Sequence, residues 1–159
     1  MIPSPERRRQ YAECRAQLAS LLEGETDLVA RMSSAAALLM EVLPRASFVG
    51  FYRLLSGGIL VAGPYQGPAA CLRIRLGQGV CGTAASENRS LLVPDVEAFP
   101  GHIACDPRSR SELVVPVRDR SGAVIAVLDL DSRERAAFDE CDQEELESIV
   151  RLIPAAERD

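Results

Sequence analysis

The chain has 159 residues, 47% hydrophobic and 26% charged, which is the composition of an ordinary globular protein. This length predicts one domain over residues 1–159 with a sizeable core. The formal net charge is −5, and the 18 basic residues, all arginines, are scattered except for one run at 7–9. This pattern argues against a nucleic-acid-binding protein. We find no signal-peptide pattern and no apolar run of membrane-spanning length, so we expect a cytoplasmic protein.

The predicted elements begin with two helices. Residues 6–22 carry apolar side chains at helical spacing, and Gly24 ends this helix. A second helix, capped by Thr26 or Asp27, continues to about residue 43. The N-terminal part of the chain is therefore predicted to be helical.

From residue 47 onward the apolar period becomes that of strands, and the predicted core runs to about residue 153. Strands are predicted at residues 48–55, 59–63, 71–76, 90–93, 112–118 and 123–132. A glycine-rich loop at 77–82 enters a short helix between the third and fourth strands, and an acidic amphipathic helix follows at 138–152. Because no strand–helix–strand repeat occurs, we predict an α+β protein with about six mainly antiparallel strands and the N- and C-terminal helices packed on one face.

The glycine-rich loop at 77–82 is also a candidate binding site. The first amides of the short helix that follows it can bind an anion. Its glycine spacing does not match a nucleotide-binding motif, so a small carboxylate is the alternative ligand.

The five cysteines are odd in number, and a reducing compartment would keep them as thiols. They form no Cys-x-x-Cys pair and the chain has one histidine, so we expect no metal site. Cys14 lies on the apolar face of the first helix, where we expect a core position, and Cys141 lies near the start of the last helix, where we expect no catalytic role. Cys105 lies in a polar loop directly before a strand, where a thiol can be partly exposed and reactive. Catalytic or redox-switching cysteines therefore remain as the hypothesis.

Two further patterns concern the strands. Asp129 and Asp131 are two residues apart at the end of a strand, so their side chains share one face. Paired carboxylates raise the pKa of at least one member. Phe48 and Tyr52 share one face of the first strand in the same way.

Several motifs together resemble those of one known family. They are Gly-Glu-Thr at 24–26, Gly-Phe-Tyr at 50–52, Gly-Pro-Tyr-Gln-Gly at 63–67, Gly-Gln-Gly-Val-Cys-Gly-Thr-Ala at 77–84, Gly-His-Ile-Ala-Cys-Asp at 101–106 and Val-Leu-Asp-Leu-Asp-Ser at 127–132. Over about residues 11–153 the chain resembles the free methionine-(R)-sulfoxide reductases, which are stand-alone GAF domains. The cysteine spacing and the loop before Glu112 are specific to that family.

The resemblance implies roles for three cysteines and leaves one choice open. Cys105 corresponds to the nucleophile, and Cys71 to the thiol that resolves it as a disulfide. Cys81 is a second candidate for the resolving or relaying thiol. His102 matches a position that suggests a role in shaping the loop, and nothing requires it to activate Cys105.

The resemblance also implies a substrate pocket. Glu112, Asp129 and Asp131 match acids that line it, without an indication of which protonates the sulfoxide and which binds the ammonium group. Phe48 and Tyr52 match the aromatic wall, where the family usually places Trp at the position of Phe48.

The implied activity is reduction of free L-methionine (R)-sulfoxide to L-methionine through a cysteine sulfenic acid and an intramolecular disulfide. The implied reductant is a thioredoxin-type protein, no metal or organic cofactor is needed, and a homodimer is expected. Two other interpretations are a GAF sensor for a small ligand such as a cyclic nucleotide, and a non-catalytic thiol redox switch. Neither explains the three acids.

Overall fold

The computed structural model describes residues 4–155. The elements in chain order are α1 (Ser4–Leu21), α2 (Leu28–Val42), β1 (Phe48–Leu55), β2 (Ile59–Gln66), β3 (Arg73–Arg75), α3 (Gly79–Glu87), β4 (Leu91–Val93), the 3-10 helix η1 (Val96–Ala98), β5 (Ser111–Arg118), β6 (Val124–Ser132) and α4 (Glu140–Val150). All strand pairs are antiparallel, in the order β3-β2-β1-β6-β5-β4. The predicted α+β class with a six-stranded sheet is confirmed.

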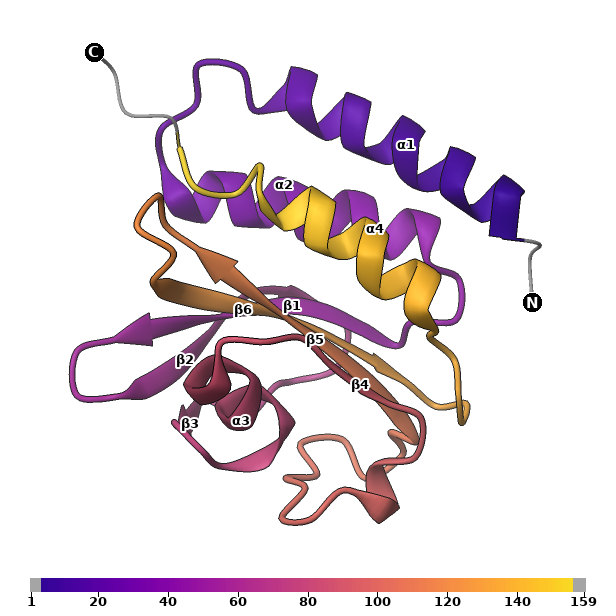
Figure 1. The fold of residues 1–159 in the computed structure, drawn as a ribbon, viewed down its shortest axis with the longest axis vertical. Helices are drawn as coiled ribbons and strands as arrows, with labels where there is room; N and C mark the ends of the chain where they lie inside the picture. Colours follow the sequence, from indigo (N-terminus) through magenta and orange to yellow (C-terminus); the bar gives the residue numbers. More distant parts are fainter. Residues whose placement is uncertain (1–3, 156–159) are drawn as a thin grey trace.

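The elements form layers around this sheet (Figure 1). The helices α2 and α4 lie on one face of the sheet, and α1 packs on top of them. The short helix α3 and the long connection from η1 to β5 lie on the other face. The expectation that the N- and C-terminal helices pack on one face of the sheet is therefore confirmed. The opposite face is covered by α3 and the connection to β5.

Alternation along β1 separates two hydrophobic clusters. Val49 and Phe51 point into the larger cluster, beneath the three long helices. Tyr52 points into the smaller cluster, which also holds Val80 of α3 and Val127 of β6. Successive side chains of a strand face opposite sides, so the same strand serves both clusters.

The two helical cysteines are buried, which confirms the core position expected of Cys14. Cys14 is 3% exposed on the inner side of α1, and Cys141 is 7% exposed near the start of α4. Both are free thiols. Their positions in the helical layer separate them from the three cysteines on the other side of the sheet.

The second strand is longer than predicted at its C-terminal end, and the third is shorter than predicted at both ends. β2 continues to Gln66 through a Gly-Pro pair that resembles a turn in the sequence, and β3 is limited to Arg73–Arg75. The pairing of β1 with β2 changes register between Gly50 and Tyr52. Beyond this irregularity, Gly50 pairs with Tyr65 and Val49 with Gln66, which extends β2. Local turn residues do not reveal such long-range pairing.

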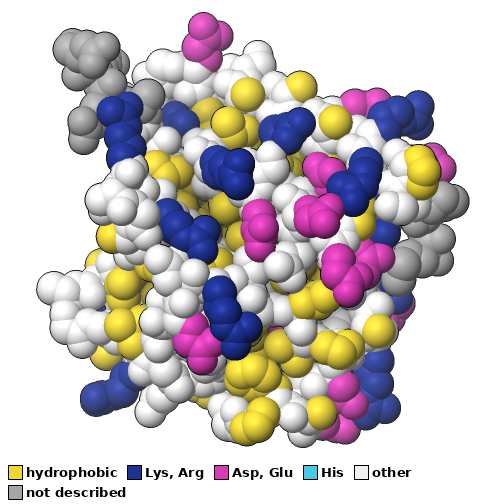
Figure 2. All heavy atoms as spheres, in the orientation of Figure 1, with side chains coloured by type: hydrophobic (Ala, Val, Ile, Leu, Met, Phe, Trp, Pro, Cys, Tyr) yellow, Lys and Arg dark blue, Asp and Glu magenta, His cyan; other side chains and the backbone are white. Residues whose placement is uncertain are grey.

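Among the described residues, no helix is long and apolar enough to cross a membrane. Figure 2 shows arginine and acidic side chains interspersed on the visible face, with hydrophobic side chains gathered toward the lower part of the view.

A buried arginine joins the three long helices. Arg31 of α2 is 8% exposed, and its guanidinium donates hydrogen bonds to four backbone carbonyl oxygens, those of Leu22, Glu25, Leu152 and Ile153. These bonds tie the ends of α1 and α4 to α2. A guanidinium with several directed donors suits this role.

We expect the substitution Arg31→Ala to lower the free energy of unfolding by about 3 kcal/mol, because it leaves buried carbonyl groups without donors. Urea denaturation followed by circular dichroism measures the loss. Arg9→Ala is the control: Arg9 is mostly exposed and its nearest carboxylate is 3.9 Å away, so its removal should change stability by less than about 0.5 kcal/mol. Equal losses in the two variants would contradict the prediction.

Candidate active site

One cavity lies between the sheet, α3 and the loop at 99–110. Among the predicted site residues, the cavity is lined by Phe48, Tyr52, Cys81, Cys105, Glu112, Asp129 and Asp131. These residues come from β1, α3, the loop, β5 and β6. The remaining predicted residue, Cys71, lies beside the cavity and is joined to Cys105. The structure therefore brings together all eight residues, which are far apart in the sequence.

The register of the central strands positions the three acids. Glu112 of β5 lies directly opposite Asp131 of β6. Asp129 lies two pairs further along, opposite Val114 on β5 and Gly50 on β1. Carboxylates placed opposite each other in adjacent strands repel, so this arrangement is unfavourable for folding alone. Such an unfavourable cluster of buried charges is a feature of functional sites.

Burial changes the protonation of these acids. Glu112 is 6% exposed and Asp129 5% exposed. Burial raises the pKa of the Glu112 carboxyl well above its usual value, and the negative charge of Asp131 raises it further. The pKa values of Asp129 and Asp131 are raised by burial and then by the charges of Glu112 and Asp129, respectively. The cavity can therefore hold a carboxylic acid in its protonated form near neutral pH.

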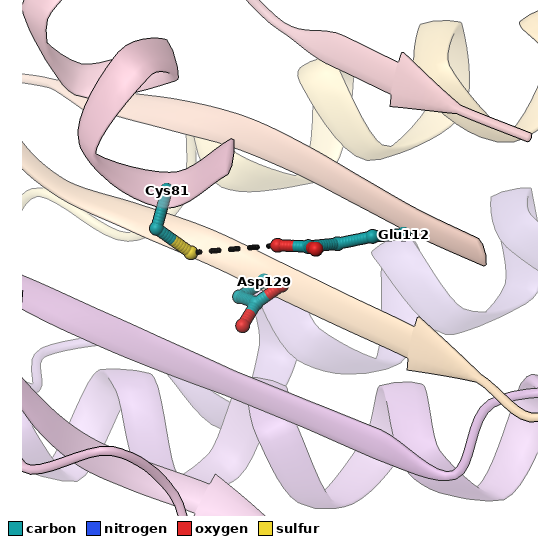
Figure 3. A group of neighbouring side chains, drawn as sticks. All are labelled: Cys81, Glu112 and Asp129. Atoms are coloured by element: carbon teal, nitrogen blue, oxygen red, sulfur yellow. Dashed lines mark hydrogen bonds between the residues drawn. The ribbon is translucent and has the colours of Figure 1, made fainter. Parts of the chain in front are cut away.

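Cys81 projects from the first turn of α3 toward two of the acids (Figure 3). Its Sγ atom lies 3.8 Å from Oε1 of Glu112, to which the thiol donates a hydrogen bond. Burial raises the pKa of the Cys81 thiol well above its ordinary value, and the charges of Asp129 and Glu112 raise it further. A thiol that stays protonated is a poor nucleophile, so this environment suits a hydrogen-bond donor better than a thiol for disulfide exchange.

One acid oxygen in this group has no partner. Oδ1 of Asp129 is buried and makes no hydrogen bond with any described residue. One ligand atom each from Cys81, Glu112 and Asp129 lies within 4.8 Å of the others. These three residues could therefore surround a cation, either a metal ion or the ammonium group of a ligand.

The raised carboxyl pKa values predict how stability depends on pH. Above the ordinary carboxyl pKa of about 4, the folded protein holds protons that the unfolded chain has lost, so the free energy of unfolding decreases as pH rises. Asp142, whose pKa is raised by burial, contributes in the same direction. We expect oxidised protein to be more stable toward urea at about pH 5 than at about pH 8.

A double variant, Glu112→Gln with Asp129→Asn, is the control for this pH dependence and should show a flatter decline. Asp106 and Asp119 have lowered pKa values, so their contributions to stability change with pH in the opposite direction and only in the more acidic range. Stability that rises between about pH 5 and about pH 8 in the unmodified protein would contradict the prediction.

An aromatic wall closes another side of the cavity. Phe48 is 5% exposed and Tyr52 is 2% exposed. The ring of Phe48 stacks on Tyr65 with 5.3 Å between ring centroids. A Cβ atom at Gly50, between the two aromatic positions on the same face, would collide with Tyr65 and would lie 2.9 Å from Cζ of Phe48. Gly50 is therefore required for this packing.

The loop that carries Cys105 is held to the acids on its inner side. Nε2 of His102 lies 3.4 Å from Oε2 of Glu112, while burial lowers the pKa of the imidazole. The carboxylate of Asp106 accepts a hydrogen bond from Nε of Arg108 at 2.9 Å. Nη2 of Arg133 lies 3.7 Å from Oδ2 of Asp106. These contacts position the loop over the cavity.

Cys71 and Cys105 form a disulfide across 34 residues of sequence, with 5.3 Å between their Cα atoms. Of the two, only Cys105 lines the cavity. The pair that the family resemblance implied is therefore close enough to be bonded, and the bond closes one end of the cavity.

The N-terminus of α3 also faces the cavity. Gln78, Gly79 and Val80 line it together with Cys81. A helix N-terminus carries free amide donors and a partial positive charge, which suit an anionic group. Gly82 allows this turn to approach β3, because a Cβ atom there would collide with the carbonyl oxygen of Arg75. The predicted anion site therefore lies next to the acids.

Sequence reasoning missed several residues of the site. Tyr65 supports Phe48, and Asp106 and Ser109 line the cavity beside Cys105. The Gly-Pro-Tyr-Gln-Gly motif could have indicated Tyr65. His102, to which we assigned only a loop-shaping role, also contacts Glu112.

Comparisons with known proteins identify the family of this chain. A family model of the GAF domain matches residues 25–156. A free methionine-R-sulfoxide reductase from Escherichia coli is 42% identical over 143 residues, covering 90% of this chain and 86% of the relative. The corresponding protein of Saccharomyces cerevisiae is 39% identical over 139 residues, covering 84% and 77%.

A solved structure shows the same relationship. The X-ray structure of free methionine-R-sulfoxide reductase from Neisseria meningitidis in complex with its substrate is 43% identical and has a TM-score of 0.86. The match covers 90% of this chain and 85% of that chain. The chain therefore belongs to the GAF domain family and, within it, to the free methionine-(R)-sulfoxide reductases.

Proposed function

We propose that this protein reduces free L-methionine (R)-sulfoxide to L-methionine with Cys105 as the nucleophile. The observation that supports this most is the position of Cys105, which lines a cavity with three carboxyl groups, two of them buried, and is bonded to Cys71. The names of the relatives point to the same substrate.

The acids next to the Cys105 loop are the best candidates for activating the sulfoxide. Glu112 contacts His102 of that loop and lies opposite Asp131 on the adjacent strand. A sulfoxide sulfur becomes electrophilic when its oxygen is protonated or strongly hydrogen-bonded, and a carboxylic acid with a raised pKa can donate that proton. We propose that Glu112, supported by Asp131, has this role.

In the reduction, the sulfur of Cys105 attacks the sulfoxide sulfur and takes over its oxygen. Methionine leaves with the electron pair on its sulfur, and Cys105 becomes a sulfenic acid. The thiol of Cys71 then attacks the sulfenic sulfur, releases water and forms the disulfide. A thioredoxin-type dithiol returns both cysteines to thiols and is itself oxidised to a disulfide.

The two charged ends of a free amino acid have complementary groups in the cavity. The unpartnered Oδ1 of Asp129 can accept a hydrogen bond from the ammonium group of the substrate. The N-terminus of α3 can bind the carboxylate of the substrate. Phe48 and Tyr52 provide an apolar surface for the methyl end. A residue inside a polypeptide has neither charged end, so we propose that peptide-bound methionine sulfoxide is excluded.

The direct test supplies free L-methionine (R)-sulfoxide with dithiothreitol or with thioredoxin, and measures methionine by chromatography. The (S) epimer and an N-acetylated amide of the sulfoxide serve as substrate controls. We expect turnover of the free (R) form only. An absence of turnover with both reductants would refute the proposed activity.

The substitution Cys71→Ser should separate the first turnover from recycling. We expect one equivalent of methionine to be released as in the unmodified protein, and thioredoxin-dependent turnover to fall by about 100-fold or more, because no disulfide forms for exchange. Rapid-quench and steady-state assays measure the two steps. Cys81→Ser is the matched control and should keep recycling. If Cys71→Ser recycles normally, the resolving role passes to Cys81.

We also propose a cytoplasmic homodimer packed through its N-terminal helices, as the family resemblance implies. Light scattering during gel filtration measures this oligomeric state directly. A monomer over the micromolar range would contradict it.

A further inference from the structure

We infer that a thioredoxin-type reductant docks on the outer side of the disulfide and attacks the sulfur of Cys71 rather than that of Cys105. This inference rests on the proposed function and concerns its recycling step. It names an interaction surface, the attacked atom and the chemistry of the partner.

The two sulfurs of the disulfide face different surroundings. Cys105 lines the substrate cavity, whereas Cys71 does not, although both residues are partly exposed. A thiolate must approach a disulfide sulfur along the line of the S–S bond and expel the other sulfur. From outside the cavity, attack on Cys71 expels Cys105 toward the cavity.

The chemistry of this step returns the catalytic thiol directly. The partner's thiolate forms a bond with Sγ of Cys71, the Cys71–Cys105 bond breaks, and its electron pair leaves on Cys105. The partner's second thiolate then attacks the partner's own sulfur in the mixed disulfide and releases Cys71. Two electrons pass from the dithiol to the protein, and the solvent supplies the protons.

An exposed apolar surface surrounds this disulfide. Leu72, next to Cys71, is 77% exposed, the largest exposed fraction among the large hydrophobic residues described. Ile103, two residues before Cys105, is 37% exposed, and Ala69 and Ala104 are also exposed. Ile103 and Ala69 also line the substrate cavity, so this surface borders the cavity, whereas Leu72 does not line it. We call these four residues the disulfide surface. Exposed apolar residues grouped at one place mark interaction sites.

The charge beside the disulfide surface indicates the kind of partner. Arg73 and Arg75 project from the outer strand β3, where Ile74 between them is buried. Neither arginine forms an ion pair with any residue in the described range 4–155. The surface therefore fits a dithiol protein whose reactive cysteine lies in an apolar patch with an acidic rim.

The first experiment changes Leu72 without changing the cavity. Oxidised Leu72→Asp protein is reduced with thioredoxin or with dithiothreitol, and free thiols are counted over time. We expect the thioredoxin rate constant to fall by about 10-fold, because an apolar contact is lost and an acidic partner is repelled, while the dithiothreitol rate stays unchanged. Leu21→Asp is the matched control: Leu21 is 57% exposed at the end of α1, in the helical layer on the other face of the sheet.

The outcomes separate docking from chemistry. An unchanged thioredoxin rate, or an equal loss with dithiothreitol, would overturn the docking surface. The assay starts from the disulfide and needs no sulfoxide, so it can succeed or fail independently of the proposed reductase activity. Substitution of both Arg73 and Arg75 by glutamate should lower the rate of disulfide reduction by thioredoxin further. It should also weaken the dependence of that rate on salt concentration.

The second experiment identifies the attacked sulfur. A thioredoxin variant that lacks its second active-site cysteine forms a mixed disulfide that cannot resolve. After rapid alkylation with iodoacetamide and proteolysis, mass spectrometry should show thioredoxin linked to Cys71 and the alkyl group on Cys105. Linkage to Cys105, or no linked species at all, would overturn the assignment.

Discussion

The substitution Cys105→Ser is expected to abolish the release of methionine even in the first turnover, lowering its rate by roughly 10³-fold or more. Serine keeps the size of the side chain but lacks a nucleophile that can accept the sulfoxide oxygen. The measurement mixes reduced protein with excess free L-methionine (R)-sulfoxide and quantifies methionine before any reductant acts. The expected result is a missing burst, not a slower steady state.

Cys141→Ala is the matched control for this experiment. Cys141 is a free buried thiol in the helical layer, far from the cavity, so its removal should leave the burst intact. A full burst in the Cys105→Ser variant would assign the nucleophile to another thiol. Denaturation curves of both variants confirm that each is folded.

The second large effect concerns the acids, where two isosteric amides should affect different kinetic constants. Glu112→Gln removes the proposed proton donor, so we expect the single-turnover rate at saturating substrate to fall by about 10²–10⁴-fold. The affinity for methionine, measured by calorimetry, should change little. Stability at neutral pH should stay equal or rise by about 1 kcal/mol, because the neutral amide removes the cost of keeping a buried carboxyl group protonated above its ordinary pKa.

Asp129→Asn is expected to act on binding instead. It removes the proposed partner of the substrate ammonium, so the affinity for methionine should fall by about 10–100-fold, while the rate at saturating substrate changes less than in Glu112→Gln. A Glu112→Gln variant with a normal saturated rate would move the donor role to another acid. Equal effects of the two substitutions on rate and on affinity would refute the division of roles.

The pattern of residues along the chain was sufficient to predict most elements and the faces of the strands. Period-two alternation predicted that Asp129 and Asp131 share a face and that Phe48 and Tyr52 share a face, and all four residues line the cavity. This succeeds because side-chain direction along a strand is a local property. The family resemblance, which depends on short motifs, supplied the selection of Cys71, Cys81 and Glu112 and the role of nucleophile for Cys105.

Which groups meet in the cavity depends on the packing of the whole chain. The pairing of Glu112 with Asp131, the contact of Cys81 with Glu112 and the unpartnered oxygen of Asp129 depend on strand register and on the placement of α3. These are set by contacts between residues distant in the sequence, which no local pattern encodes. The extension of β2 to Gln66 was missed for the same reason.

The loop around Cys105 shows both contributions. Its polar residues and single cysteine were enough to predict a partly exposed, reactive thiol. The fold places Cys105 and Cys71 with 5.3 Å between their Cα atoms, and of the two only Cys105 lines the cavity. That difference between two adjacent sulfurs is a property of the packed loop, because each side chain's surroundings come from other elements.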